Sequence, residues 1–229
     1  MEASLISRAA RAYVLPMFCY LAGTWLAGQW PEHYALGYTA VVVLVGAITL
    51  ALIRGSGVLR PHTRLGPGIG VGLIGIALWI GLSELRWEEQ IAAWLPTFLQ
   101  PGPRSAFDPW ERLPSSARAV AFVGVRLVGL SLLVPVVEEI FWRGFLYRWI
   151  QDPDWESVPL GQWHAKAFWL VTLLFTLAHP EWFAAAVYGV LINALWVGKR
   201  DLWTCVVAHA TSNLVLGLYI LATGSWWLW

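Results

Sequence analysis

The sequence predicts an all-α protein, a polytopic bundle of transmembrane helices that forms a single membrane domain over residues 1–229. Three observations predict this fold class. Of the 229 residues, 58% are hydrophobic and only 13% are charged, against about 25% charged in a typical soluble domain. Several apolar stretches are long enough to cross a bilayer. Many of the 17 tryptophans stand at the ends of those stretches, where membrane proteins place an aromatic belt.

The individual spans follow from length, because a helix needs about 20 mostly apolar residues to cross the hydrocarbon. About seven spans are expected. Trp87–Gln100 is interpreted as an amphipathic helix lying in the interface, with an eighth half-span as the alternative. The N-terminus lacks a clear A-x-A cleavage site, so a retained first helix is expected rather than a signal peptide. The expected spans are Tyr13–Trp30, His33–Ile53, Gly66–Leu85, Ala117–Val137 with an extension to about Ile150, Ala165–His179, Trp182–Val197 and Leu202–Thr223.

The distribution of charge predicts the orientation of the chain and excludes one class of partner. Most arginines and lysines of the short loops fall on one side, which the positive-inside rule makes cytoplasmic together with the N-terminus. The net charge is only +1 and no basic block is present, so nucleic-acid binding is not expected. Cys19 and Cys205 lie in apolar segments and are expected to be free, buried thiols.

The first polar cluster lies inside the fourth stretch and contains Glu138, Glu139 and Arg143. Ionisable groups within a span cost roughly 2.5–3.5 kcal/mol each and mark function by default. Adjacent helical residues point about 100° apart, so the two carboxylates face different ways. Arg143 lies one turn after Glu139, where it neutralises that carboxylate. Pro135 removes a helix hydrogen bond to the carbonyl of Ser131 and predicts a kink there. The alternative is an interfacial charge cluster that ends a span.

Two further polar positions follow in later stretches. Phe175 and His179 share one helix face, and Pro180 disfavours further helix at His179. His209 and Asn213 are one turn apart, well inside the last span, and could donate hydrogen bonds to an oxyanion or ligate a metal. The alternatives are a structural histidine at a helix end and polar packing between helices.

The motifs EExxxR, FxxxH and HxxxN, in this order on three late apolar segments, resemble the CPBP family, which includes the type II CAAX prenyl endopeptidases. The resemblance covers about Leu133 to Tyr219 and implies a catalytic core over residues 117–223. The stretches FTLAHPEW, LWTCVVAHATSNLVLGLY and GSWWLW resemble a narrower bacterial subgroup associated with exosortase (PEP-CTERM) systems. That subgroup implies a location in the bacterial inner membrane.

The resemblance also implies a role for each motif residue. Glu138 would activate water, with His179 sharing that water, and His209 and Asn213 would bind the oxyanion. Supporting roles fall to Glu139, Arg143 and Phe175. No cofactor is certain, but Zn²⁺ is an alternative, with His179, His209 and Glu138 as its ligands. Because no HExxH motif is present, a glutamate-activated water is favoured.

Arg126, in the fourth stretch, belongs to none of these motifs. One hypothesis is that it binds the C-terminal carboxylate of a substrate. The alternative is a buried ion pair with an acidic neighbour.

The function expected from these residues is that of an intramembrane endopeptidase. Its partners would be the lipid bilayer and a membrane-associated protein or peptide, either lipidated or carrying a sorting tail. One alternative is a non-catalytic scaffold or immunity-type protein that retains the fold. Another is a transporter or proton pathway, which would need polar residues strung through several helices.

Overall fold

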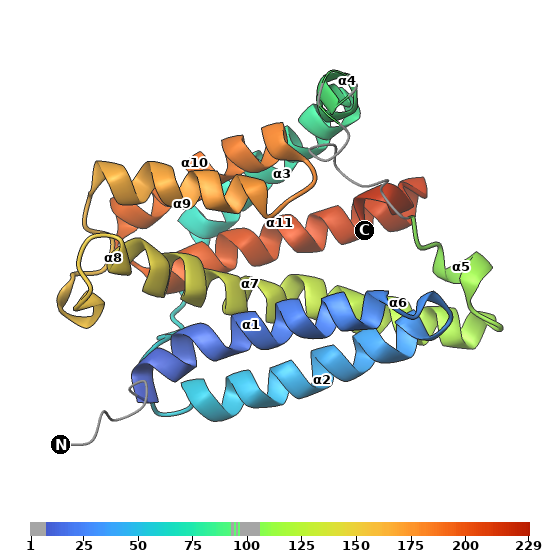
Figure 1. Ribbon diagram of the computed structural model, residues 1–229, viewed down its shortest axis with the longest axis horizontal. Helices are drawn as coiled ribbons and strands as arrows, with labels where there is room; N and C mark the ends of the chain where they lie inside the picture. Colours follow the sequence, from blue (N-terminus) through green and yellow to red (C-terminus); the bar gives the residue numbers. More distant parts are fainter. Residues whose placement is uncertain (1–7, 93, 95, 97–105) are drawn as a thin grey trace.

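A computed structural model describes residues 8–92, 94, 96 and 106–229. The described residues contain no β-strand, so the expected helical bundle is confirmed. Most of the longer helices run roughly along the long axis of the molecule, whereas the helix Gly66–Glu84 is oblique to it (Figure 1). The α-helices are α1 (Arg8–Gly28), α2 (Tyr34–Ile53), α3 (Gly66–Glu84), α4 (Trp87–Ala92), α5 (Pro109–Arg112), α6 (Ser116–Val128), α7 (Val134–Glu139), α8 (Tyr147–Trp149), α9 (Ala165–Leu177), α10 (Trp182–Lys199) and α11 (Leu202–Thr223).

Five helices among the described residues are long and apolar enough to cross a membrane, and the chain is therefore an integral membrane protein. Two other expected spans, Tyr13–Trp30 and Ala165–His179, correspond to α1 and α9, which are not among the five. The 13 residues of α9 extend about 20 Å, less than the thickness of the hydrocarbon core. The five helices are Pro31–Ile53, Gly66–Glu84, Ser116–Trp149, Trp182–Lys199 and Leu202–Thr223.

Because α9 is short, its C-terminal end does not reach the far end of the bundle. The turn between α9 and α10 lies part-way along the molecule, whereas α6 and α11 continue beyond it (Figure 1). Polar residues at this turn are therefore placed inside the bundle rather than at its rim. The expected interfacial helix Trp87–Gln100 begins as α4, and residues 93, 95 and 97–100 lie outside the described residues.

The predicted fourth span is one continuous helix, Ser116–Trp149, as its expected extension to about Ile150 implies. Two segments of this helix, Gly129–Leu133 and Ile140–Leu146, have π-helical geometry. The π-helical segments flank α7 on both sides. Such bulges recur at functional sites because they change the direction in which the following side chains point.

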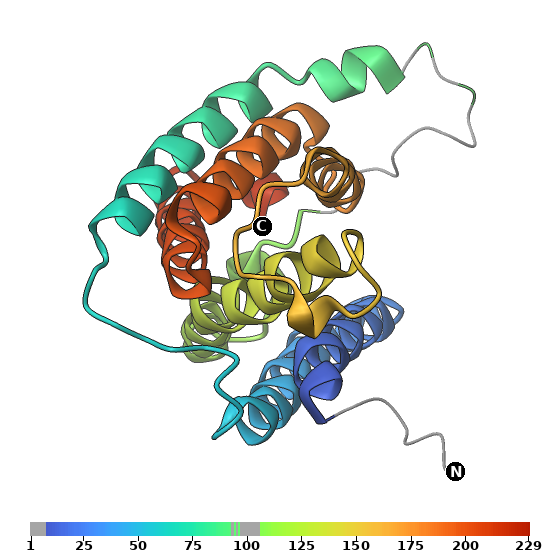
Figure 2. The ribbon, with the colours of Figure 1, turned by 90° about the vertical axis from the view of Figure 1, so that its left-hand side faces the viewer.

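The outer helix α3 packs closely on α11 and α10 (Figure 2). At Gly72 an added Cβ atom would lie 2.5 Å from the carbonyl oxygen of Ala208 in α11. Only glycine fits such a contact, and small residues let helices approach closely where lipid offers no hydrophobic drive for association. The approach fixes the depth of α11, which carries the HxxxN motif.

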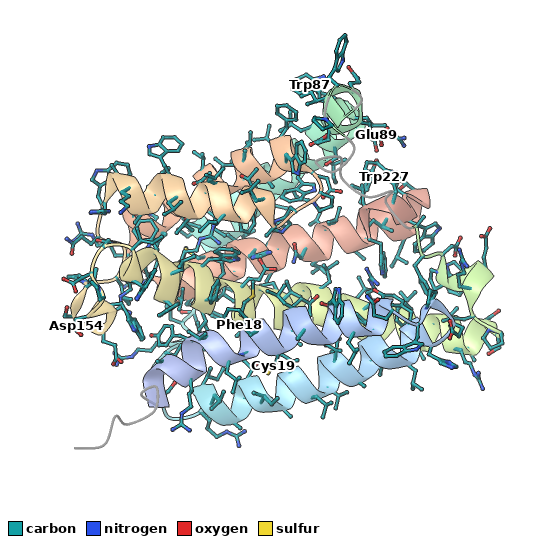
Figure 3. The ribbon with its side chains drawn as sticks, viewed as in Figure 1. Phe18, Cys19, Trp87, Glu89, Asp154 and Trp227 are labelled. Carbon is teal, nitrogen blue, oxygen red and sulfur yellow. The ribbon has the colours of Figure 1, made fainter. Side chains whose placement is uncertain are left out.

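Two loops meet at one end of the bundle. His62, between α2 and α3, makes a 2.8 Å hydrogen bond with Asp201, between α10 and α11. The basic residues Arg60 and Lys199 therefore lie at the same end, as the charge distribution predicts, while the orientation in the membrane stays a prediction. Asp154, between α8 and α9, lies at this end as well, and Trp227, beyond α11, lies at the opposite end (Figure 3).

Candidate active site

A cavity of about 270 Å³ lies among α3, α7, α9, α10 and α11, next to the end of α9. All four side chains that the sequence predicts to be catalytic line it: Glu138, His179, His209 and Asn213. The structure thus brings the three motifs together, although they lie on different helices. The polar groups face a wall of apolar and aromatic side chains, which is the usual make-up of a binding pocket.

Beside the cavity, Glu139 is fully buried and is the centre of an ion-pair network. Its Oε1 atom accepts a 3.0 Å hydrogen bond from Nη1 of Arg143 and lies 2.8 Å from Nδ1 of His209. Arg143 is also fully buried and packs over the ring of Phe175, 5.1 Å from its centre. The expected neutralisation of Glu139 by Arg143 is confirmed. Its bond to His209 was not expected.

Asn193, in α10, is a network member that the sequence interpretation missed. Its Oδ1 atom accepts a 3.1 Å hydrogen bond from Nε of Arg143, and its amide donates to the Phe168 carbonyl and the Thr172 hydroxyl of α9. The side chain is completely buried. An amide in the middle of an apolar helix was the available signal, because buried polar groups in membranes require partners.

Glu138 points into the cavity, away from the network. Its carboxylate is only partly buried, but Oε2 is shielded from solvent and has no hydrogen-bond partner in the described part of the chain. The two adjacent glutamates therefore have different surroundings, as their 100° separation predicts. Unpartnered buried oxygen atoms are costly, and a carboxylate kept in this way is available to a ligand or to water.

His179 is fixed in place by the end of α9. Its Nδ1 atom lies 2.7 Å from the carbonyl oxygen of Phe175, and its ring packs against Phe175 and Trp79 at centre distances of 4.3 and 5.5 Å. With Nδ1 donating to that carbonyl, Nε2 is left to act in the cavity. Helix α9 ends at Leu177, which agrees with the expected effect of Pro180.

Asn213 holds the helix that carries the glutamates. In the first π-helical segment, Val134 N–H donates to the Gly129 carbonyl, five residues back. The next donor in this register would be residue 135, which is a proline and has no N–H. The free carbonyl of Leu130 instead accepts a 2.8 Å hydrogen bond from the Asn213 amide. Pro135 was expected to free the Ser131 carbonyl, and the structure shows that the carbonyl bound by Asn213 is that of Leu130, in a segment that is locally π rather than α.

Three cavity side chains have the chemistry of metal ligands. His179, His209 and Glu138 all line the cavity. In the described residues, however, no group of three His, Cys, Asp or Glu side chains is arranged to hold a metal ion. The predicted zinc ligands do not fit such a site in this arrangement, so no catalytic step is derived through zinc.

Arg126 lies outside the cavity wall, packed against the rings of Tyr34, Tyr38 and Trp229. None of the ion pairs between described residues includes it. The alternative expected from the sequence, a pair with an acidic neighbour, is therefore not what the structure shows.

Comparisons with known proteins cover the part of the chain that carries the three motifs. Residues 120–215 match the family of type II CAAX prenyl endopeptidases, Rce1-like. The chain is also 36% identical over 58 residues to the fluoride-specific ion channel FluC of Pseudomonas fluorescens (strain SBW25), covering 24% of this chain and 46% of the channel. The chain thus spans less than half of this relative's length, and no solved structure matches it. The segment that carries the motifs is similar to the type II CAAX prenyl endopeptidases, which supports the predicted resemblance at the level of the family and leaves the exosortase-associated subgroup a prediction.

Proposed function

We propose that the protein is an intramembrane endopeptidase that hydrolyses a peptide bond of a membrane-associated substrate. One observation carries the proposal: Glu138 presents an unpartnered carboxylate oxygen to a cavity that His179, His209 and Asn213 also line. The match of residues 120–215 to the CAAX endopeptidases supports the same reaction class.

Glu138 is the general base in this mechanism. Its carboxylate takes a proton from a water molecule while the resulting hydroxide attacks the carbonyl carbon of the scissile peptide bond. Nε2 of His179 orients the same water, since Nδ1 is bound to the Phe175 carbonyl. When the carbon–nitrogen bond breaks, Glu138 returns the proton to the leaving amine, so the carboxylate is regenerated.

His209 and Asn213 stabilise the oxyanion of the tetrahedral intermediate. In its protonated form His209 donates from both ring nitrogens, with Nδ1 bound to Glu139 and Nε2 directed to the oxyanion. One amide hydrogen of Asn213 is bound to Leu130, and the second is available to the oxyanion.

The substrate class that we propose is a protein or peptide with a lipid anchor or an apolar sorting tail. Such a substrate partitions into the bilayer. The turn after α9, which lies part-way along the molecule (Figure 1), contributes to the lining of the cavity. The loop end that carries Arg60 and Lys199 is proposed to be cytoplasmic, in the inner membrane of a bacterium.

The proposal is tested without knowledge of the natural substrate. Membranes from cells that produce wild type, Glu138→Gln or the exposed control Glu111→Gln are compared by mass spectrometry for new peptide ends. We expect new ends with wild type and Glu111→Gln, and a loss of about 10²- to 10⁴-fold with Glu138→Gln. New ends that persist in Glu138→Gln would refute the base. No new ends with any variant would favour a non-catalytic scaffold.

Purified protein in nanodiscs then defines the substrate and the mechanism. Wild type and Glu138→Gln are incubated with lipidated CAAX-type peptides and with sorting-tail peptides, each with and without a zinc chelator. Cleavage that resists the chelator supports the glutamate mechanism, and loss of cleavage with the chelator would require a metal.

The short similarity to a fluoride channel favours a second candidate, the passage of a small anion. Ion passage requires polar groups along a continuous path, whereas the polar groups described above converge on one cavity and its adjoining network. Fluoride efflux from liposomes, followed with an electrode, separates the two candidates. Efflux by wild type that also persists in Glu138→Gln would support the channel.

A further inference from the structure

Arg126 is a cation within the helix Ser116–Trp149 whose surroundings are aromatic. Its guanidinium carbon lies 5.0 to 5.6 Å from the centres of three rings, those of Tyr34, Tyr38 and Trp229. Nη1 donates a hydrogen bond to the Tyr34 hydroxyl. Ring faces stabilise a cation but do not satisfy its N–H groups, and a guanidinium has five of them. A cation in a span is expected to find an anion, yet no ion pair between described residues includes Arg126.

Arg126 continues the helix face that forms one wall of the cavity. Leu130, Val134 and Glu138 follow each other at intervals of four residues, and all three line the cavity. Arg126 is the next residue in this series, four positions before Leu130. Trp229 links the two places, because it lines the cavity and also packs on Arg126. The cavity has one end near Glu138, and the guanidinium of Arg126 therefore lies just beyond its opposite end.

We propose that Arg126 binds the C-terminal carboxylate of the substrate whose peptide bond lies at Glu138. This inference rests on the proposed function. The planar edge of a guanidinium matches a carboxylate in a bidentate pair, and the three rings hold that guanidinium in one position. A substrate lying along the wall formed by Leu130 and Val134 would bring its end to this group.

The distance predicts where the substrate is cut. Arg126 precedes Glu138 by 12 positions, which at the α-helical rise of about 1.5 Å per residue is at most about 18 Å along the helix, because the π-helical segment between them rises less per residue. An extended peptide advances about 3.3 Å per residue, so the carboxylate lies about five residues beyond the scissile bond. The cleavage site is thus set by its distance from the C-terminus of the substrate. In a longer peptide the cut bond therefore lies farther from the N-terminus, at the same distance from the C-terminus.

The test uses a pair of N-terminally acylated ten-residue alanine–leucine peptides, one with a free C-terminal carboxylate and one with a C-terminal amide. Binding is measured in phosphatidylcholine nanodiscs with Glu138→Gln, which binds without cutting, and with Glu138→Gln/Arg126→Gln. We expect the acid to bind about tenfold or more tightly than the amide to the first protein and equally to the second. Arg126→Lys, which keeps the charge but loses the planar fork, is expected to be intermediate. Arg118→Gln, an exposed position of the same helix, is the matched control.

Binding and cleavage are read separately, so the two proposals fail in different ways. An acid preference that is lost with Arg126→Gln supports the carboxylate site even if wild type cuts neither peptide. Equal binding of acid and amide to both proteins overturns it, even if both peptides are cut. Native mass spectrometry provides a further arm. The carboxylate site would also be overturned if the protein retained an anionic phospholipid that Arg126→Gln loses, and if the acid peptide showed no preference. Arg126 would then bind a lipid headgroup.

Discussion

The two faces of α7 show how neighbouring glutamates acquire opposite surroundings. Glu139 is fully buried between Arg143 and His209, and that side is closed to the cavity except at His209. Glu138 faces the cavity with Oε2 unpartnered among the described residues. Oε2 of Glu139 is unpartnered too, but Oε1 of Glu139 is held by both Arg143 and His209. We infer that the partnered side supports the structure, and the unpartnered side is the one proposed to perform the chemistry. The ring of Phe175 contacts both Arg143 and His179.

The largest effect on stability is expected from Arg143→Leu, which removes the buried ion pair with Glu139. The substitution leaves buried Glu139 with His209 as its only remaining partner, and removing one partner of a buried pair costs about 3–5 kcal/mol. Unfolding in detergent, followed by circular dichroism, measures this loss. Glu138→Gln is the matched comparison and should lose cleavage with little loss of stability.

A double variant sharpens this prediction. In Arg143→Leu/Glu139→Leu the buried Arg–Glu pair is removed as a unit, so much of the stability is expected to return. Cleavage should not return, because His209 has lost the carboxylate that orients its ring. Equal stability of the single and double variants would show that the ion pair is not what Arg143 contributes.

Local spacing predicted one part of the site well. The pairs Glu139–Arg143 and Phe175–His179 lie one helical turn apart, so helix geometry alone places them together. The apolar composition likewise predicted the all-α bundle, because water is absent from the bilayer core and backbone groups must be paired within each helix.

Contacts between distant helices could not be predicted in this way. The bonds of Asn193 to Arg143 and of Asn213 to the Leu130 carbonyl depend on how each helix is rotated about its axis. Spans that are apolar all round do not define that rotation. The two π-helical segments were not foreseen either, and in the register of the first of them it is the Leu130 carbonyl that lacks an N–H from residue 135.

A smaller effect on stability is expected from Asn213→Ala. This substitution tests whether the Asn213 amide both supports the helix at Leu130 and donates to the oxyanion. The Leu130 carbonyl loses its donor, at a cost of about 1 kcal/mol, and the oxyanion loses a donor, which lowers the cleavage rate by about 10²- to 10³-fold. Adding Pro135→Ala supplies an N–H to that carbonyl. Stability measured in detergent should then recover while peptide cleavage in nanodiscs stays low. Recovery of both would mean that Asn213 only supports the helix.

The smallest effect is expected where a polar cluster lies outside the spans, at Asp201. Its side chain caps α11 by accepting from the Thr204 N–H at 2.9 Å and bonds to His62. Partial burial acts to raise the pKa of Asp201, but hydrogen bonds from Thr204 and His62 outweigh it and hold the pKa below its ordinary value. The lowered pKa means that the carboxylate stabilises the fold above its unfolded pKa of about 3.9, and that this contribution is lost as the pH falls through the folded pKa.

The comparison for this cluster is Asp201→Asn, which keeps a good helix cap but removes the charge. The difference in stability between wild type and Asp201→Asn should be at most about 1 kcal/mol at neutral pH, because the pair is partly exposed, and should shrink below about pH 4. Thermal unfolding of both proteins across this pH range measures it. Burial is expected to make the Glu139–Arg143 pair more important for stability than the partly exposed Asp201–His62 pair. A loss of stability in Asp201→Asn as large as that in Arg143→Leu would contradict this expectation.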